Sequence, residues 1–173
     1  MPEHTLCRQQ FIPQPIDTVF AFFADAANLD ELTPPWLHFQ IRTPFPITMK
    51  TGALIEYTIR WRFLPVRWRT EILDWSPPHR FIDQQIKGPY ELWHHTHTFQ
   101  THSGGTLMTD LVRYQIPLGP LGTIAHALIV KRDIAAIFDY RFSRIAERFG
   151  SVKWPESLSL TTKGLDHATG QNV

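Results

Sequence analysis

The chain of 173 residues contains a single cysteine, Cys7, so no internal disulfide bond can form. A protein that folds without disulfides is typical of a reducing compartment. The first residues, MPEH, lack the basic and then apolar order of a secretion signal. These two absences together predict a cytoplasmic protein.

Excess charge and long apolar runs are also missing. The 17 Lys and Arg residues nearly balance the 16 Asp and Glu residues, and no basic run stands out, which argues against a nucleic-acid partner. The longest apolar window, residues 118–130, has Gly and Pro near its start. It is shorter than the roughly 20 residues that a membrane-spanning helix requires. We therefore predict no nucleic-acid partner and no membrane span.

Aromatic side chains, in contrast, are abundant. They make up 13% of the residues and include six Trp. Large rings can fill a core, and they can also line a pocket for a flat or apolar ligand. The length suits one domain with a substantial core. We assign that domain to residues 1–150 and expect a polar, loosely ordered tail at 151–173.

The pattern of apolar residues predicts an α+β domain. Ile16, Val19, Phe20 and Phe23 are spaced as on one face of a helix over residues 16–24, and a second short helix is expected at 26–32. Alternation with period two predicts seven strands, at residues 4–12, 38–42, 53–63, 66–75, 80–87, 88–99 and 106–116. Short connections between them favour an antiparallel sheet, with the first strand near an edge or facing the long helix described next.

A long helix over residues 121–149 follows the last strand. The residues predicted to form its buried stripe are Ile124, Leu128, Lys131, Ile134, Phe138, Arg141, Phe142, Ile145 and Phe149. A curved antiparallel sheet of about seven strands has one face to bury, and this helix is long enough to cover it. A cavity then forms between sheet and helix wherever the inward side chains leave space.

The stretch 88–99, GPYELWHHTHTF, has the most distinctive chemistry. Read with period two, Trp93, His95, His97 and Phe99 share one face of a strand, and the large rings indicate that this face points inward. Two histidines on an inner wall can bond to carboxylates, hydroxyls or water. They can also orient a polar group of a ligand, or act as acid and base.

A metal site is a further use for such a pair. Histidines two apart on one strand can bind zinc if a third ligand comes from a neighbouring element. The carboxylates that could supply it are Glu56, Glu71, Asp83 and Asp110. No cysteine pair and no His-Glu-x-x-His helix accompanies them, so we predict neither a metal nor a cofactor.

The candidate site residues fall into two groups. The candidates for catalysis are His95, His97, Asp83 and Asp110. The candidates for ligand binding are Trp36, Tyr57, Trp61, Trp68, Trp93, His95, His97, Tyr114, Phe138 and Arg141. Arg69, Glu71 and Gln85 can join a buried polar network around the histidines, although Arg69 and Glu71 can equally form ion pairs on the outer face of the sheet.

Several further strings of the sequence are distinctive: PIDTVFAFF (15–23), NL (28–29), TPPWL (33–37), WSPP (75–78), FIDQQ (81–85), the stretch 88–99 and IFDYR (137–141). Together they resemble the START-like superfamily, also called SRPBCC or the helix-grip fold. The similarity spans residues 3–149 and is greatest to a bacterial group labelled ligand-binding or cyclase/dehydrase-like. It implies a helix-grip fold with a hydrophobic ligand cavity, and it supplies no catalytic residues.

Three functions are compatible with these features. The first is a binding or transfer protein for a hydrophobic or aromatic small molecule such as a lipid, quinone or polyketide. The second is a cyclase/dehydratase or hydrolase that uses His95 or His97 with a nearby carboxylate. The third is an accessory module that binds another protein. The first is preferred, because the sequence indicates a ligand-holding fold more clearly than any reaction.

Overall fold

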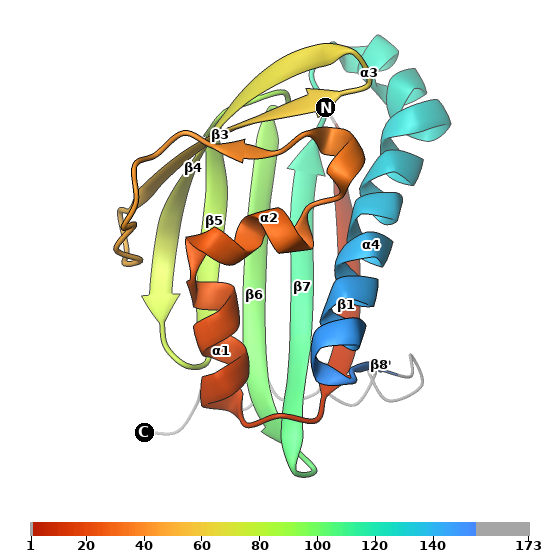
Figure 1. The fold of residues 1–173 in the computed structure, drawn as a ribbon. Coiled ribbons are helices and arrows are strands. Elements are labelled where there is room, and N and C mark those ends of the chain that lie inside the picture. The colour runs from red at the N-terminus through yellow and green to blue at the C-terminus, as the bar shows by residue number, and fades with distance from the viewer. Residues whose placement is uncertain (1, 155–173) are drawn as a thin grey trace, which may run out of the picture.

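The computed structural model describes residues 2–154, which form one curved antiparallel sheet with helices on its concave side (Figure 1). The sheet order is β2-β3-β4-β5-β6-β7-β1-β8, and neighbouring strands are joined by short turns from β3 to β7. The strands are β1 (Glu3–Ile12), β2 (Gln40–Ile41), β3 (Leu54–Trp61), β4 (Leu64–Ser76), β5 (Arg80–Lys87), β6 (Leu92–His102), β7 (Gly105–Gln115) and β8 (Val152–Lys153).

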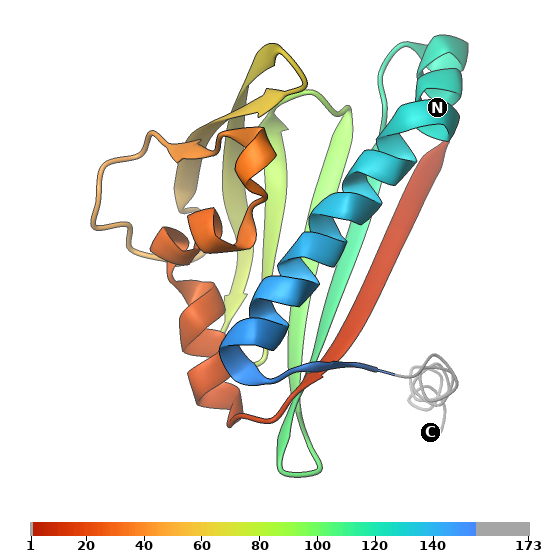
Figure 2. The ribbon, with the colours of Figure 1, turned by 45° about the vertical axis from the view of Figure 1, so that its right-hand side comes forward.

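The helices cover the concave face in two groups. Between β1 and β2 lie α1 (Ile16–Ala24), the 3₁₀ turn Ala26–Asn28, α2 (Leu29–Leu32) and the 3₁₀ turn Pro35–Leu37. After β7 the chain continues through α3 (Gly119–Ala125), a π-helical turn (His126–Val130) and α4 (Lys131–Phe149). Figure 2 shows this long C-terminal helix running diagonally across the sheet. The predicted helix-grip architecture is therefore confirmed, with one short strand, β8, beyond the seven expected.

Two apolar clusters fix these helices to the sheet. Under α1, Val19, Phe20 and Phe23 pack with Ile12 and Phe99. Under α4, a second cluster is formed by Val112, Tyr114, Val130, Ile134 and Phe138. Burial of such large side chains stabilises each contact by about 1.5–3 kcal/mol per side chain relative to an exposed position. The space between the two clusters is where polar residues of the inner sheet face are found.

The predicted stripe of the long helix is wrong over its first turns. Ile124 and Leu128 are 57% and 71% exposed, whereas His126 and Val130 are buried. The cause is the π turn, which winds in one extra residue and so rotates the residues before it by about 100° relative to the rest. The buried His126 places Nε2 2.9 Å from the hydroxyl oxygen of Tyr114 on β7.

The chain after α4 leads into the short strand β8. Gly150 ends the helix with φ of 71°, a left-handed conformation that suits glycine, and its N–H bonds to the carbonyl of Ala146. Ser151 is buried, and β8 then pairs with β1. The rest of the predicted tail, residues 155–173, lies outside the described residues. Within residues 2–154, no helix has both the length and the apolar character to cross a membrane.

The rotation at the π turn can be tested by two substitutions in the C-terminal helix. Ile145 is 1% exposed, so Ile145→Ala should lower the free energy of unfolding by about 2–5 kcal/mol through the cavity it leaves. Leu128→Ala should change it by no more than about 0.5 kcal/mol because the side chain faces solvent. Urea denaturation measures both values. A large loss from Leu128→Ala would show that the stripe continues unbroken through the turn.

Candidate functional site

A cavity of about 390 Å³ lies between the sheet and the helices. Its wall is mainly apolar and aromatic and is built from the inward side chains of β3, β4, β5 and β6 on one side and from the helices on the other. Tyr57, Trp61, Trp68, Trp93, Phe138 and Arg141 line it, as do Asp83, His95 and His97. These residues were all singled out from the sequence, and the structure brings them to one space.

Two of the predicted wall residues lie elsewhere. Trp36 is 54% exposed and packs its edge on Tyr140, with 5.7 Å between ring centroids. Tyr114 is buried beside Trp93, with 6.1 Å between their ring centroids, and does not line the cavity. Alternation along β7 correctly turns Tyr114 inward, but the cavity does not extend to its position.

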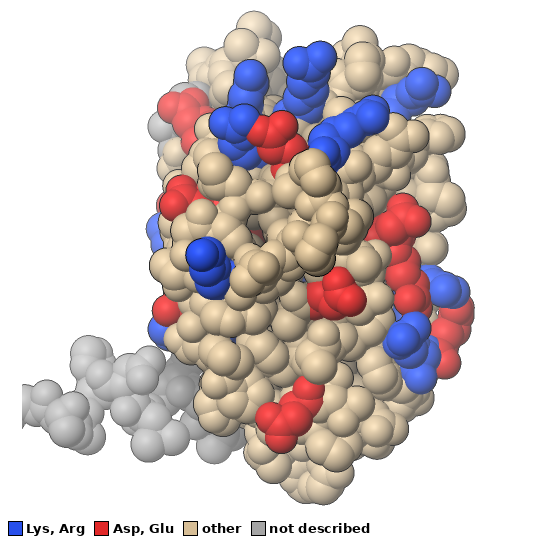
Figure 3. Space-filling view, turned by 60° about the vertical axis from the view of Figure 1, so that its left-hand side comes forward, with Lys and Arg blue, Asp and Glu red and all other residues tan. Residues whose placement is uncertain are grey.

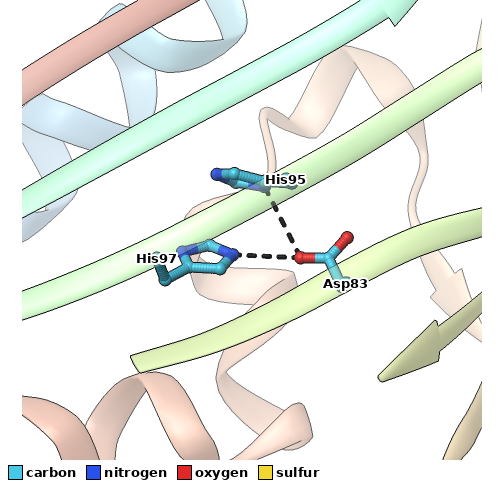
Figure 4. Close-up of side chains that lie close together, drawn as sticks. All are labelled: Asp83, His95 and His97. Carbon is cyan, nitrogen blue, oxygen red and sulfur yellow. Dashed lines mark hydrogen bonds and ion pairs between the residues drawn. The ribbon is translucent and has the colours of Figure 1, made fainter. Parts of the chain in front are cut away.

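Four titratable side chains meet on the inner face of three adjacent strands. Asp83 on β5 is directly opposite His95 on β6, and His97 on β6 is directly opposite Asp110 on β7. Because side chains of a strand alternate between faces, this register puts both carboxylates and both imidazoles on the same inner surface. Figure 4 shows Asp83 reaching from its strand toward the two histidines of the neighbouring strand.

The distances within this cluster are those of hydrogen bonds and ion pairs. His97 Nε2 lies 3.0 Å from Asp83 Oδ2, and His95 Nε2 lies 3.0 Å from Asp110 Oδ1. His97 Nδ1 is 2.8 Å from the same oxygen of Asp110, off the line of a good hydrogen bond. His95 Nδ1 is 3.6 Å from Asp83 Oδ2. Each carboxylate therefore faces both imidazoles.

Arg141 closes the cluster from the helical side. Its Nε lies 3.4 Å from Asp110 Oδ2, the oxygen that does not face the histidines, and its guanidinium lies over the ring of Phe23. Phe81 stacks on the ring of His97 at 4.0 Å between centroids. The aromatic ring and the guanidinium hold the buried groups on two sides and leave the cavity side open.

The charges in this cluster balance without bulk water. Burial opposes ionisation of Asp110, but Arg141 and the two histidines hold its pKa well below the usual value, and the pKa of Asp83 is also lowered by His97 and His95. Burial and its neighbour His97 lower the pKa of His95. Burial opposes the charge of His97, but its contacts with the Asp110 and Asp83 carboxylates outweigh this and raise its pKa. With His97 protonated and His95 neutral, the two carboxylates, the Arg141 guanidinium and the His97 imidazolium sum to zero.

Four residues expected near the histidines are not part of this cluster. Glu56 and Arg69 form an ion pair on the outer face, and Glu71 lies on the same face of β4 as Arg69. Gln85 faces inward, but its side chain bonds to the backbone of Tyr90, with Nε2 2.6 Å from the carbonyl oxygen. It shapes the turn before β6, where a Cβ at Gly88 would lie 2.2 Å from Gln85 Oε1.

Other wall residues were not singled out from the sequence. Phe81, Tyr90, Ile55 and Ile72 line the cavity, and each except Tyr90 lies on a strand face that period two turns inward. Alternation was thus a sufficient signal for three of them. Tyr90 lies in the turn before β6, where the period gives no direction for the side chain.

The cavity reaches the surface where α3 begins. Leu118 lines the cavity although it is 74% exposed, and Trp61 at the end of β3 lines it and donates from Nε1 to Asp133 Oδ2 at 2.9 Å. Phe63 and Leu64, in the adjoining β3–β4 hairpin, are 92% and 64% exposed. Figure 3 shows the molecule from the left-hand side of Figure 1, with Lys and Arg side chains gathered at the upper end of that face. Exposed arginines of the hairpin are Arg60, Arg62 and Arg67.

Comparison with known families and structures gives a consistent picture. Residues 12–138 match the family model described as polyketide cyclase/dehydrase and lipid transport. No curated protein matches the chain.

Solved structures with this fold include a protein from Chromobacterium violaceum, with a TM-score of 0.64 and 12% identity over 84% of this chain and 96% of that one. A protein from Arthrobacter aurescens has a TM-score of 0.63 and 12% identity, over 97% of this chain and 93% of that one. A norcoclaurine synthase mutant from Thalictrum flavum, in complex with a transition-state analogue, has a TM-score of 0.61 and 14% identity, over 85% of this chain and 96% of that one. Identities this low show the fold alone.

The opposite shifts of the two histidines give a direct test by NMR titration of metal-free protein. His97 should titrate above about 6.5 and His95 below it. Because a raised pKa favours the charged form in the fold, the stabilisation by His97 is complete below about pH 6.5 and fades as pH rises through the folded pKa.

Asp110→Asn removes a carboxylate that faces both rings and should lower the pKa of each histidine. Asp139→Asn, at an exposed position of α4, is the matched control and should leave both unchanged. Equal titration of the two histidines in the wild-type protein would contradict the charge distribution.

Proposed function

Because the chain belongs to the polyketide cyclase/dehydrase and lipid transport family, we propose that it binds a hydrophobic or aromatic small molecule between the sheet and the C-terminal helix. The observation that carries this proposal is a mainly apolar cavity with one polar corner. Ligand sites generally combine such a wall with a few convergent polar groups. The protein then acts as a binding or transfer protein.

The cavity also indicates the chemistry of the ligand. Its volume of about 390 Å³ is in the lower part of the range of small-molecule pockets, which suits a compact ring system or a short acyl chain. Tyr57 and Trp68 stack at 5.8 Å between centroids, and Trp93 packs edge-on against Trp68. Such walls favour flat rings. The corner formed by Asp83, His95, His97 and Arg141 can hydrogen-bond a carbonyl or hydroxyl group.

The exposed residues near the cavity mouth bear on the route by which a ligand enters, and the single cysteine bears on the compartment of the protein. Exposed Phe63, Leu64 and Leu118 lie near this mouth together with the exposed arginines of the hairpin, so an incoming molecule would meet both apolar and basic side chains. We place the protein in the cytoplasm, since its one cysteine suits a reducing compartment.

Occlusion of the cavity tests this function. Ile137 lines the cavity from α4, so Ile137→Trp should fill part of it and weaken binding of the fluorescent apolar probe anilinonaphthalene sulfonate about tenfold or more. Ala136→Trp, at the adjacent exposed position, is the matched control and should bind as the wild type does. Fluorescence titration gives both dissociation constants, and native mass spectrometry of the purified protein should show a co-purified apolar compound. Equal affinity in the two variants would exclude the cavity as the binding site.

A second function, cyclisation or dehydration of a polyketide-like substrate, is favoured by one observation. Two histidines, each paired with a carboxylate, face the cavity. A histidine could remove the proton from a carbon between two carbonyl groups, the resulting enolate would attack a second carbonyl of the same chain, and the other histidine would protonate the alkoxide. No oxidant or reductant is consumed, and each histidine–carboxylate pair resembles the general acid–base arrangement of many enzymes.

This reaction would be detected with a linear aromatic poly-β-ketone and mass-spectrometric product analysis. His95→Gln and His97→Gln should each reduce turnover by about 10²–10⁴-fold while probe binding changes little. His79→Gln, at an exposed position in the turn before β5, should have no effect. Turnover that survives both substitutions would assign the histidines to ligand binding alone.

A further inference from the structure

The side of the histidine–aspartate cluster that faces the cavity has the donor set of a metal site. Asp83, His95 and His97 each offer one donor atom, and these three atoms lie within 4.8 Å of one another (Figure 4). Two of the edges of this triangle are 3.0 and 3.6 Å. A tetrahedral zinc ion with bonds of about 2.0–2.1 Å requires edges of about 3.3–3.4 Å. We propose that Asp83, His95 and His97 bind one divalent transition metal ion, with zinc as the best fit.

The groups behind the triangle support the same assignment. A metal-bound histidine typically directs its other ring nitrogen to a carboxylate, which fixes the ring. Here one carboxylate serves both rings, because Asp110 Oδ1 lies 3.0 Å from His95 Nε2 and 2.8 Å from His97 Nδ1. The nitrogens that face Asp83 are the ones left for a metal. Arg141 contacts the far oxygen of Asp110 and also lines the cavity, so its charge belongs to the same polar corner.

The frame around the three donors is rigid. The histidines are two residues apart on β6, and Asp83 is directly opposite His95 on β5. Both strands are in the interior of the sheet, and Phe81 and Phe138 pack on the two imidazole rings. Donors on paired strands need little rearrangement to receive an ion. The remaining adjustment needed to bind an ion is a change in the distance between the donor nitrogens of His95 and His97.

The fourth position of the ion would open into the cavity. Asp83, His95 and His97 line the cavity, whereas Asp110 does not. Three protein ligands with one open position are typical of zinc sites that act on a bound molecule rather than of purely structural ones. With both histidines neutral, the formal charges of Asp83, Asp110 and Arg141 sum to −1, so binding a divalent ion gives the site a net charge of +1. An anionic oxygen, such as hydroxide or a ligand carboxylate or enolate, would neutralise the site.

This inference is independent of the ligand proposed above, because metal binding can be measured with the cavity empty. It also distinguishes two states of the protein that exclude each other, a metal-bound state and a metal-free state. The metal uses the histidine nitrogens that acid–base chemistry would need, so histidine-based proton transfer belongs to the metal-free protein only.

Cobalt(II) is the probe of choice, since its visible absorption reports the coordination geometry. Protein stripped with a chelator should bind one equivalent of cobalt with strong bands in the visible range, and zinc should displace it. His95→Ala, His97→Ala and Asp83→Asn should each abolish the bands. His79→Ala, an exposed histidine outside the cluster, and Asp139→Asn are matched controls that should keep them. Asp110→Asn keeps the three donors and should weaken binding about 10–100-fold.

Circular dichroism and thermal unfolding of each stripped variant show whether the fold is kept, and probe binding shows whether the cavity is. Cobalt bands in the folded wild type that vanish only in the three donor variants support the site. Absent bands, or bands that persist in folded His95→Ala and His97→Ala, would overturn it. Probe binding by metal-free protein that fails to bind cobalt would sink the metal site and leave the ligand-binding function intact.

Discussion

The structure depends on the burial of two carboxylates in the middle of a sheet. Asp83 and Asp110 can stay ionised there because both imidazoles and the Arg141 guanidinium face them. An isolated buried charge would cost several kcal/mol, so the cluster requires a fixed register of β5, β6 and β7 and a fixed position of the helix that carries Arg141. A slip of one residue in either strand pair would turn the acids to the other face. The polar cluster and the fold around it therefore constrain each other.

The cavity follows from the same arrangement. The sheet curves around the C-terminal helix, while α1 with its neighbours and α4 pack on different parts of the concave face (Figures 1 and 2). Large rings from both sides surround the remaining space, and the charged cluster occupies one corner of its wall. An apolar wall with one polar corner combines affinity for rings or acyl chains with a means of orienting a single oxygen atom. Binding, catalysis and metal coordination are all uses of that corner, which is why they compete.

Much of this arrangement could be predicted from the sequence. Period two places His95 and His97 on the face of Trp93 and Phe99, and it places Asp110 with Val112 and Asp83 with Phe81, which are all inward. Which carboxylate pairs with which histidine could not be predicted, because it depends on the cross-strand register of β5, β6 and β7. Ile124 and Leu128 were predicted to be buried but are exposed, because the extra residue of the π turn rotates them away from the sheet. The spacing of the apolar residues does not reveal that extra residue. Gln85 was assigned to the polar cluster because strand position cannot show that the Tyr90 backbone lies within its reach.

The central claim is that the charged corner of the cavity holds the polar group of an otherwise apolar molecule. A crystal structure of the protein as purified, or soaked with an aromatic ketone, tests it most directly. The account predicts electron density in the cavity, with one polar atom about 3 Å from a polar side-chain atom of Asp83, His95, His97 or Arg141, or from an ion held by them. A cavity filled by its own side chains, or a ketone bound only on the outer surface, would contradict it.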